Sequence, residues 1–160
     1  MMTETFKFKE NMIGSKKTTI AAVCVAITVF ALGYFLSDKY SIQGNRIVKV
    51  KLGDTFFKAE AVSSGDKLAK GLGGRKELCE SCAMLFEFQN SGKHAFWMKG
   101  MEIAIDIIWI SGRRIVHVEK NIQSDFSGTL TPVSDADAVL EINAGKFNEM
   151  GLEVGDMVEL

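Results

Sequence analysis

The hydrophobic pattern divides the chain into one long apolar stretch near its start and a series of short apolar runs after it. Residues 18–37, between Lys17 and Asp38, contain no charged side chain. A helix of about twenty residues rises about 30 Å, which matches the hydrocarbon core of a bilayer. We therefore predict a transmembrane helix over residues 18–37, preceded by a tail over residues 1–17.

The charges that flank this apolar stretch predict its orientation. Lys16 and Lys17 directly precede it, whereas Asp38 and Lys39 follow it and nearly cancel. The positive-inside rule then predicts a cytoplasmic N-terminus and an extracytoplasmic C-terminal part. A cleaved signal peptide is the alternative, but the apolar core is long and residues 35–40 offer no clear cleavage site. We expect an uncleaved signal-anchor in a single-pass membrane protein.

The apolar runs that follow have the length of strands. A linker over residues 38–46 leads into two β-rich runs, residues 47–52 and 55–62, which flank Gly53-Asp54 and predict a hairpin. Further strand-like runs cover residues 84–88, 95–98, 103–110, 114–122, 138–142 and 154–160. Short helices are expected over residues 64–70 and 145–150. Residues 47–160 are therefore predicted to form an all-β domain, β-rich with one or two short helices, as a small barrel or sandwich.

The net charge of the chain argues against nucleic acid as a partner. The whole chain carries a formal charge of −1. Residues 1–37 hold four of the 19 basic and two of the 20 acidic residues, so the remainder carries −3. A mildly acidic domain is a poor match for a phosphate backbone, so we expect no nucleic acid as a partner.

Five ordered blocks of the second half form a family pattern. They are Met-Leu-Phe-Glu-Phe at 84–88, Phe-Trp-Met-Lys at 96–99, residues 105–110, residues 139–145 and residues 151–156. Together they resemble domain-of-unknown-function family 192 over about residues 47–160, and Gly71-Leu72 with Arg75 is similar to another element of that family. The resemblance implies a small β-rich domain, often secreted or anchored, and no agreed activity.

Two acids interrupt apolar runs. Asp106 lies between Ile105 and Ile107, and Glu141 lies between Leu140 and Ile142. A carboxylate in such a strand must be hydrogen-bonded or face a polar cleft, because burying it alone is costly. Each acid is therefore either a structural lock, paired with a cation or a backbone amide, or the acid of a site with a shifted pKa.

Alternation in the Phe-Trp-Met-Lys block suggests a binding face. In a strand, Trp97 and Lys99 share one face while Phe96 and Met98 share the other. This pattern fits a sheet with one core face and one outer face. It also fits an aromatic platform with a cation at its rim, suited to a small anionic or sugar-like ligand. The candidate ligand-binding residues are Arg75, Trp97, Lys99, Asp106 and Glu141.

Cys79 and Cys82 form a C-x-x-C motif. In an extracytoplasmic domain a structural disulfide is the first interpretation, because oxidising compartments preserve such bonds. A redox-active pair, a free reduced pair, or a metal site with His94 and His117 are the alternatives. The helix setting of a redox pair and the usual spacing of a zinc site are both missing. We predict no metal site and no cofactor.

Two functions remain open at this point. The first is a binding module at the cell envelope, for a small ligand or an envelope protein, with the membrane contacted through residues 18–37. The second is a hydrolase-like enzyme that uses Asp106 and Glu141 as paired carboxylates. Geometry separates them: convergence on one pocket favours a site, whereas bonding of Asp106 to backbone amides makes it structural. We favour the binding module, since no known catalytic motif occurs.

Overall fold

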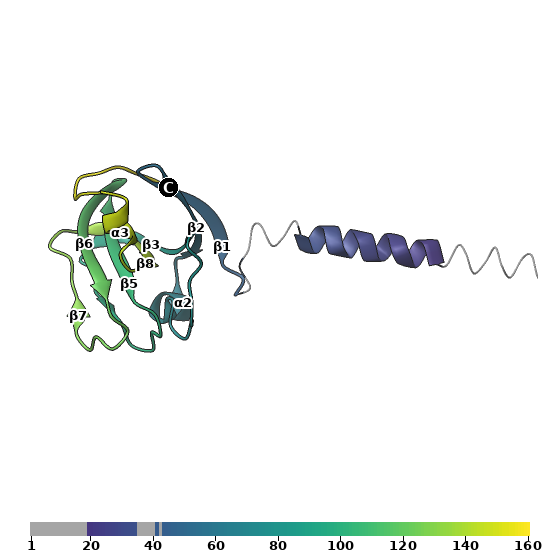
Figure 1. Ribbon diagram of the computed structural model, residues 1–160, viewed down its shortest axis with the longest axis horizontal. Coiled ribbons are helices and arrows are strands. Elements are labelled where there is room, and N and C mark those ends of the chain that lie inside the picture. The colour runs from purple at the N-terminus through teal and green to yellow at the C-terminus, as the bar shows by residue number, and fades with distance from the viewer. Residues whose placement is uncertain (1–18, 35–40, 42) are drawn as a thin grey trace, which may run out of the picture. The chain divides into compact units, whose positions relative to one another are not determined.

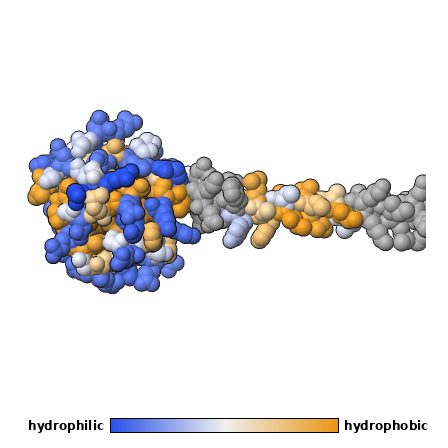
Figure 2. Space-filling model, turned by 90° about the horizontal axis from the view of Figure 1, so that it is seen from above, coloured by the Kyte–Doolittle hydropathy of each residue, from blue (hydrophilic) through white to orange (hydrophobic). Residues whose placement is uncertain are grey.

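The computed structural model describes residues 19–34, 41 and 43–160 (Figure 1). The chain divides into two compact units, Met1–Lys39 and Tyr40–Leu160. In the first unit residues 19–34 form a helix, and Figure 2 shows that its visible surface is mainly apolar. No helix within the described ranges is both long and apolar enough to cross a membrane. The predicted tail over residues 1–17, the ends of the predicted span, and residues 38–40 and 42 of its following linker lie outside the described residues.

The second unit is built on a seven-stranded sheet. In chain order its strands are β1 (Arg46–Leu52), β2 (Thr55–Val62), β3 (Cys82–Gly92), β5 (Ile105–Ser111), β6 (Arg114–Ile122), β8 (Ala136–Asn143) and β9 (Val158–Glu159). Their order across the sheet is β6-β5-β8-β3-β2-β1-β9. β2 and β3 pair in parallel, and the other neighbours pair antiparallel. The parallel pair requires a long connection, which contains the short helix α2 (Gly65–Lys70).

Smaller elements complete this unit. β4 (Phe96–Trp97) and β7 (Thr129–Leu130) pair as a separate two-stranded sheet. α3 (Lys146–Glu149) is a single helical turn after β8. The expectation of a β-rich domain with short helices is confirmed, as are the hairpin of β1 and β2 and its turn at Gly53-Asp54.

The two edges of the large sheet meet at one end. Arg114 and Met157 form an antiparallel bridge between the edges. Close by, the Ile115 N–H donates to the Asp156 carbonyl at 3.0 Å, and the Val158 N–H donates to a carbonyl just before β6 at 2.9 Å. The sheet therefore curls into a half-barrel whose edge strands are joined there (Figure 1). Of the two architectures predicted, the barrel is the closer description.

Both faces of the central strands are buried. One apolar cluster draws side chains from all seven strands, among them Leu140 and Ile142, and fills the inside of the curl. A second cluster includes Val139 and Ile107 and lies on the outer face, where β4, β7 and Leu72 contribute to it. Burial on both faces explains why the β5 sequence is almost continuously apolar instead of alternating. The outer face of β3 and β8, beneath α2 and β4, is where the candidate site lies.

Candidate functional site

Asp106 is a structural acid. Its side chain is completely buried, and Oδ1 accepts the Asn121 N–H at 2.8 Å and the Gly145 N–H at 3.0 Å. Oδ2 accepts the Phe147 N–H at 2.9 Å. These three hydrogen bonds join β5 to the end of β6 and to the start of α3, so they compensate for the desolvation of the carboxylate. This outcome is the structural lock, one of the two alternatives considered for Asp106.

Asp106 and Glu141 do not form a pair. In the ladder between β5 and β8, Asp106 lies opposite Ile142, and Ile107 lies opposite Glu141. Directly opposed residues share a face of the sheet, whereas successive residues of a strand point to opposite faces. Asp106 therefore faces the inside of the curl and Glu141 faces its outer side. The structure does not provide the paired carboxylates that the hydrolase hypothesis requires.

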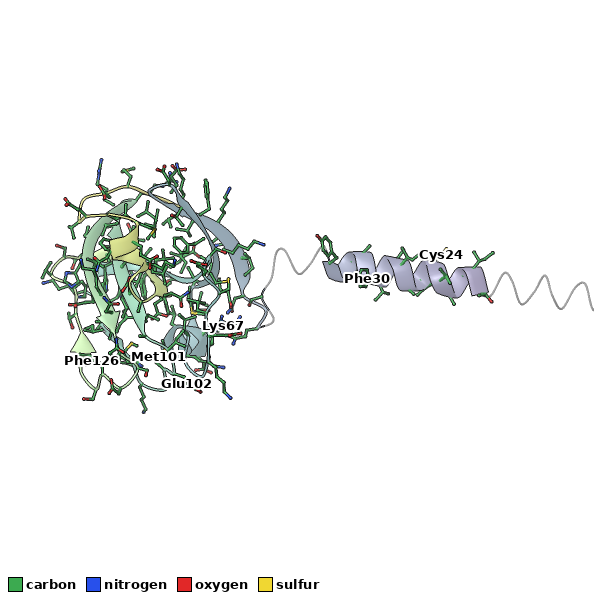
Figure 3. The ribbon with its side chains drawn as sticks, viewed as in Figure 1. Cys24, Phe30, Lys67, Met101, Glu102 and Phe126 are labelled. Carbon is green, nitrogen blue, oxygen red and sulfur yellow. A yellow bond between two sulfur atoms is a disulfide. The ribbon has the colours of Figure 1, made fainter. Side chains whose placement is uncertain are left out.

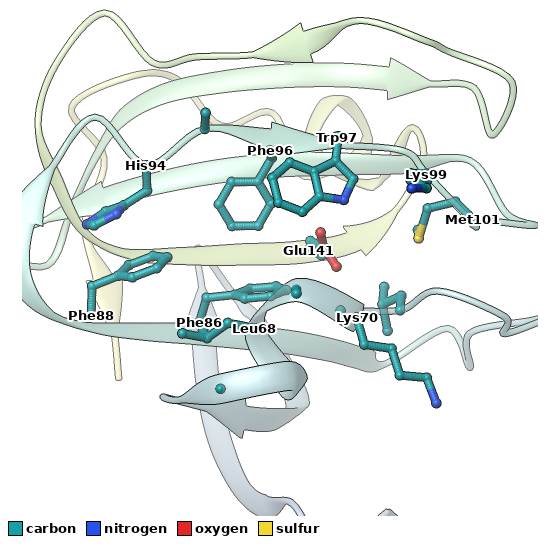
Figure 4. Close-up of a pocket in the computed structure, with 15 residues that line it drawn as sticks. Leu68, Lys70, Phe86, Phe88, His94, Phe96, Trp97, Lys99, Met101 and Glu141 are labelled. Carbon is teal, nitrogen blue, oxygen red and sulfur yellow. The ribbon is translucent and has the colours of Figure 1, made fainter.

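Glu141 lies at a pocket on the outer face. The pocket has a volume of about 290 Å³, and its walls come from α2 and the loop after it, from β3, and from the segment 94–101 around β4. Figure 4 shows the Glu141 carboxyl group between the rings of Phe96 and Trp97 on one side and Phe86 on the other. Lys70 and Lys99 also line the pocket, and in Figure 4 both lie on the side away from Phe88 and His94.

Aromatic contacts build the walls. The rings of Phe86 and Phe96 meet edge to face, with centroids 4.9 Å apart. The rings of Phe88 and His94 stack with centroids 3.5 Å apart. The buried indole of Trp109 donates to the His94 carbonyl at 2.8 Å, which attaches the segment before β4 to β5. These contacts hold the rings in place, so the pocket is largely preformed.

The Glu141 carboxyl group is buried without full compensation. The residue is 4% exposed, and its Oε2 atom has no hydrogen-bond partner within the described part of the chain. Burial raises the pKa of Glu141 to about 8, although the positive charge of Arg75 and a hydrogen bond with the Leu72 backbone act in the opposite direction. Because that pKa lies above 7, the group is mostly protonated at neutral pH.

Gly71 allows the chain to pass close to this carboxyl group. Its φ is +50°, a conformation that L side chains rarely adopt. A Cβ atom there would lie 3.3 Å from the Phe86 ring and 3.6 Å from Glu141 Oε2. Any larger residue would be strained and would fill the space in front of the acid.

Arg75, whose charge acts on Glu141, belongs to a second polar group. Its Nη1 donates to Glu60 Oε1 at 2.6 Å, and Asn45 Nδ2 donates to Glu60 Oε2 at 2.9 Å. Burial alone would raise the pKa of Glu60, but hydrogen bonds from Arg75, Asn45 and Ser41 outweigh it and lower that pKa. Across the described residues, the buried side-chain polar atoms without a partner are Asn45 Oδ1, Arg75 Nε and Glu141 Oε2.

Three of the five candidate ligand-binding residues therefore line one pocket. They are Trp97, Lys99 and Glu141, whereas Arg75 does not line the pocket and acts on Glu141 through its charge, and Asp106 lies on the other face. The predicted alternation of the Phe-Trp-Met-Lys block is confirmed, because Phe96 and Met98 are buried while Trp97 and Lys99 are exposed.

Sequence reasoning missed several residues of the walls. These are Lys70 on α2, the two phenylalanines of β3 and His94. Phe86 and Phe88 are two apart in a predicted strand, so they share a face and could have been identified as an aromatic pair. Lys70 and His94 carry no such signal, because the sequence does not show that α2 and the segment before β4 pack beside β3.

Cys79 and Cys82 are joined by a disulfide, as predicted. The bond closes a turn at the start of β3, directly after the connection that contains α2. Asn143 Nδ2 donates to the Leu78 and Cys79 carbonyls at 3.0 and 3.1 Å and attaches this turn to β8. Within the described ranges no group of three or more histidine, cysteine or acidic side chains could hold a metal ion. His117 instead contacts Glu119 at 3.2 Å.

The fold and the site together define a class of protein: a small β half-barrel with a buried acid in an aromatic pocket on its outer face. The model of domain-of-unknown-function family 192 (DUF192), described as "Uncharacterized ACR", matches residues 48–160. The chain therefore belongs to that family, and the resemblance inferred from the sequence is confirmed.

Solved structures show the same fold. A protein of unknown function from Novosphingobium aromaticivorans DSM 12444 is 30% identical, with a TM-score of 0.72 over 76% of this chain and 90% of that one. A "putative transcription regulator" from Sinorhizobium meliloti 1021 is 23% identical, with a TM-score of 0.68 over 72% of this chain and 94% of that one. The second likeness concerns the fold alone. A comparison with curated proteins gives no match.

Proposed function

We propose that the unit Tyr40–Leu160 is a binding module that takes a small molecule into the pocket beside Glu141. The observation that carries this proposal is Glu141 Oε2, a buried polar atom at the pocket that has no hydrogen-bond partner in the described structure. An unsatisfied buried polar group costs about 1–3 kcal/mol. A ligand that hydrogen-bonds to this oxygen would recover that free energy on binding.

The shape of the pocket supports a ligand of one ring. A volume of about 290 Å³ lies just below the usual range for drug-sized ligands, so it suits a small one. The rings of Phe86, Phe96 and Trp97 offer flat apolar faces, and Trp97 is 49% exposed, so it can cover a ligand that enters from solvent. A flat apolar body with one polar group directed at Glu141 fits these walls.

A pair of variants on α2 tests this proposal. Ala69 lines the pocket, and Ala69→Trp should fill it from an exposed helix position. Lys67 is exposed on the same helix without lining the pocket, so Lys67→Trp is the matched control (Figure 3). We expect ring-containing fragments to shift the Trp97 indole signal in NMR spectra of the wild type and Lys67→Trp, and to lose this effect in Ala69→Trp. Equal shifts in both variants would refute the pocket as the binding site.

We further propose that residues 18–37 anchor the chain in a membrane, with the N-terminus in the cytoplasm and the domain outside. The uncharged stretch and the preceding Lys16 and Lys17 support this orientation. The described part of the helix exposes large apolar side chains, including Phe30 at 79% (Figure 3). The Cys79–Cys82 disulfide also supports an oxidising compartment.

Protease added to intact cells tests the anchor in a chain tagged at both ends. We expect the C-terminal tag to be lost while the N-terminal tag stays protected and sediments with membranes. Loss of the N-terminal tag alone would reverse the proposed orientation. Recovery of both tags in the soluble fraction would exclude the anchor.

A further inference from the structure

The charged side chains around the pocket are unequally distributed in sign. Lys70 and Lys99 line it, and the positive charge of Arg75 also acts on Glu141. Glu141 is the one acidic residue among the lining residues, and it is buried. The nearby acid Glu60 is engaged with Arg75 at 2.6 Å. With a proton on Glu141, the pocket therefore presents positive charge at its edge and one neutral hydroxyl group inside.

We propose that the ligand is an organic acid, whose flat ring packs between the aromatic walls while its carboxylate accepts a hydrogen bond from the Glu141 carboxyl group. This inference rests on the binding function proposed above and adds the chemical class of the ligand. In this arrangement Lys70 and Lys99 offset the negative charge of the ligand's carboxylate as it leaves water.

The hydrogen bonds around Glu141 leave its carboxyl group able to act as a hydrogen-bond donor to a ligand. A Leu72 backbone hydrogen bond acts on this carboxyl group, whereas its Oε2 atom has no donor directed at it. A protonated carboxyl group carries its hydrogen on the oxygen that accepts no hydrogen bond, so Oε2 can donate to a ligand. A hydrogen bond from a carboxylic acid to a carboxylate is charge-assisted, and such bonds are about twice as strong as neutral ones.

The opposite ligand chemistry fits less well. An ammonium group would require the charged form of Glu141, and it would enter past Lys70 and Lys99, which repel it. A ligand with hydroxyl groups alone would satisfy Glu141 but would gain nothing from the two lysines. The organic acid is the class that uses both the buried oxygen and the lysines.

Every element packed around Glu141 contributes to the expected pH dependence. α2 contributes Lys70, the segment around β4 contributes His94 and Lys99, and Arg75 follows α2. The residues opposite Glu141 on the neighbouring strands are Met84 and Ile107, which do not titrate. His94 also lines the pocket, so the experiment includes a variant that removes the Glu141 carboxyl group alone.

Three probes with one ring and different polar groups make the test. Benzoate, benzyl alcohol and benzylamine are titrated into the full-length protein at about pH 7 and about pH 9, on either side of the pKa of about 8. The chain contains two tryptophans, so the indole signals of Trp97 in the pocket and buried Trp109 report binding and provide an internal reference. We expect benzoate to bind most tightly at pH 7. We expect the affinity for benzoate to fall about tenfold at pH 9, because the protonated fraction of Glu141 falls by about that factor.

Two variants separate the contributions of Glu141 and Lys99 to the binding of benzoate. Glu141→Gln keeps a neutral donor, so benzoate should still bind while the change between the two pH values disappears. Lys99→Gln should lower the affinity for benzoate and leave the affinity for benzyl alcohol unchanged. Lys67→Gln, at an exposed position of α2, is the control and should change neither. A pH effect of the same size in Glu141→Gln would overturn the inference, because Glu141 would then not be its source.

The outcomes distinguish this inference from the function on which it rests. Tighter binding of benzylamine than of benzoate, or equal binding of all three probes, would overturn the organic acid while leaving a small-molecule pocket in place. Failure of all three probes to shift Trp97 would count against the pocket as a site for ring compounds and so against the proposed function itself.

Discussion

Replacing Glu141 by glutamine should make the stability of the protein less dependent on pH. The folded state holds the Glu141 proton up to a pKa of about 8, whereas the unfolded chain releases it near the ordinary glutamate pKa of 4.5. Between these values the folded state binds more protons, so a rise in pH favours unfolding. The stabilisation is fully present below about pH 4.5 and is lost progressively until about pH 8. Glu141→Gln has no proton to lose and removes this contribution.

The size of the effect follows from the width of that interval. One proton per molecule changes the free energy of unfolding by about 1.4 kcal/mol for each pH unit. Between about pH 5 and about pH 7.5 the wild type should therefore lose about 3 kcal/mol relative to Glu141→Gln. Glu141 is almost completely buried, so solvent screening does not reduce this figure as it would at the surface. Other titrating groups are the same in both proteins and cancel in the difference.

Urea unfolding at a series of pH values measures this difference. Each curve gives the free energy of unfolding, and the wild type minus variant difference is plotted against pH. Glu102→Gln, which changes an exposed carboxylate, is the matched control and should give a flat difference. Parallel profiles for the wild type and Glu141→Gln would refute the reasoning, because Glu141 would then titrate alike in the folded and unfolded states.

Three further predictions concern the surroundings of the site. Arg75→Gln should raise the pKa of Glu141 further, because it removes a nearby positive charge; an NMR titration that finds no rise would contradict this. Asp106→Ala should lower the free energy of unfolding by about 3 kcal/mol or more in urea, because three buried N–H groups lose their acceptor. Cys79→Ser with Cys82→Ser should lower it by roughly 2 kcal/mol, the value for a short loop. For either of these two variants, a urea midpoint equal to that of the wild type would contradict the predicted loss of stability.

The strands that the sequence predicted are those with a strong apolar pattern. The hairpin over residues 47–52 and 55–62 was identifiable because alternating runs flank a glycine-containing turn. β7 was not predicted, since two residues at Thr129–Leu130 carry no periodic signal and are a strand only through pairing with β4. The parallel pairing of β2 with β3, and the bridge between Arg114 and Met157, depend on contacts far apart in the sequence that no local pattern encodes.

The different roles of the two buried acids could not be predicted from the sequence around each of them. Asp106 and Glu141 present the same local pattern, one carboxylate between aliphatic residues, and both are buried. Their roles differ because the register between β5 and β8 sends them to opposite faces of the sheet. One face offers three backbone amides from the end of β6 and the start of α3, and the other offers aromatic rings. No property of either residue alone distinguishes these environments.

That difference is also why we propose a binding site on the outer face of the sheet and none on the inner face. Asp106 carries three hydrogen bonds from backbone amides, which explain its presence through stability. Glu141 Oε2 has no such bond, and an apolar residue at this position would fit the surrounding cluster without the desolvation of a carboxyl group. Local features that lower stability without a structural gain are expected at functional sites. Among the two buried acids, Glu141 alone has this property, and it lines a cavity with lysines at its edge.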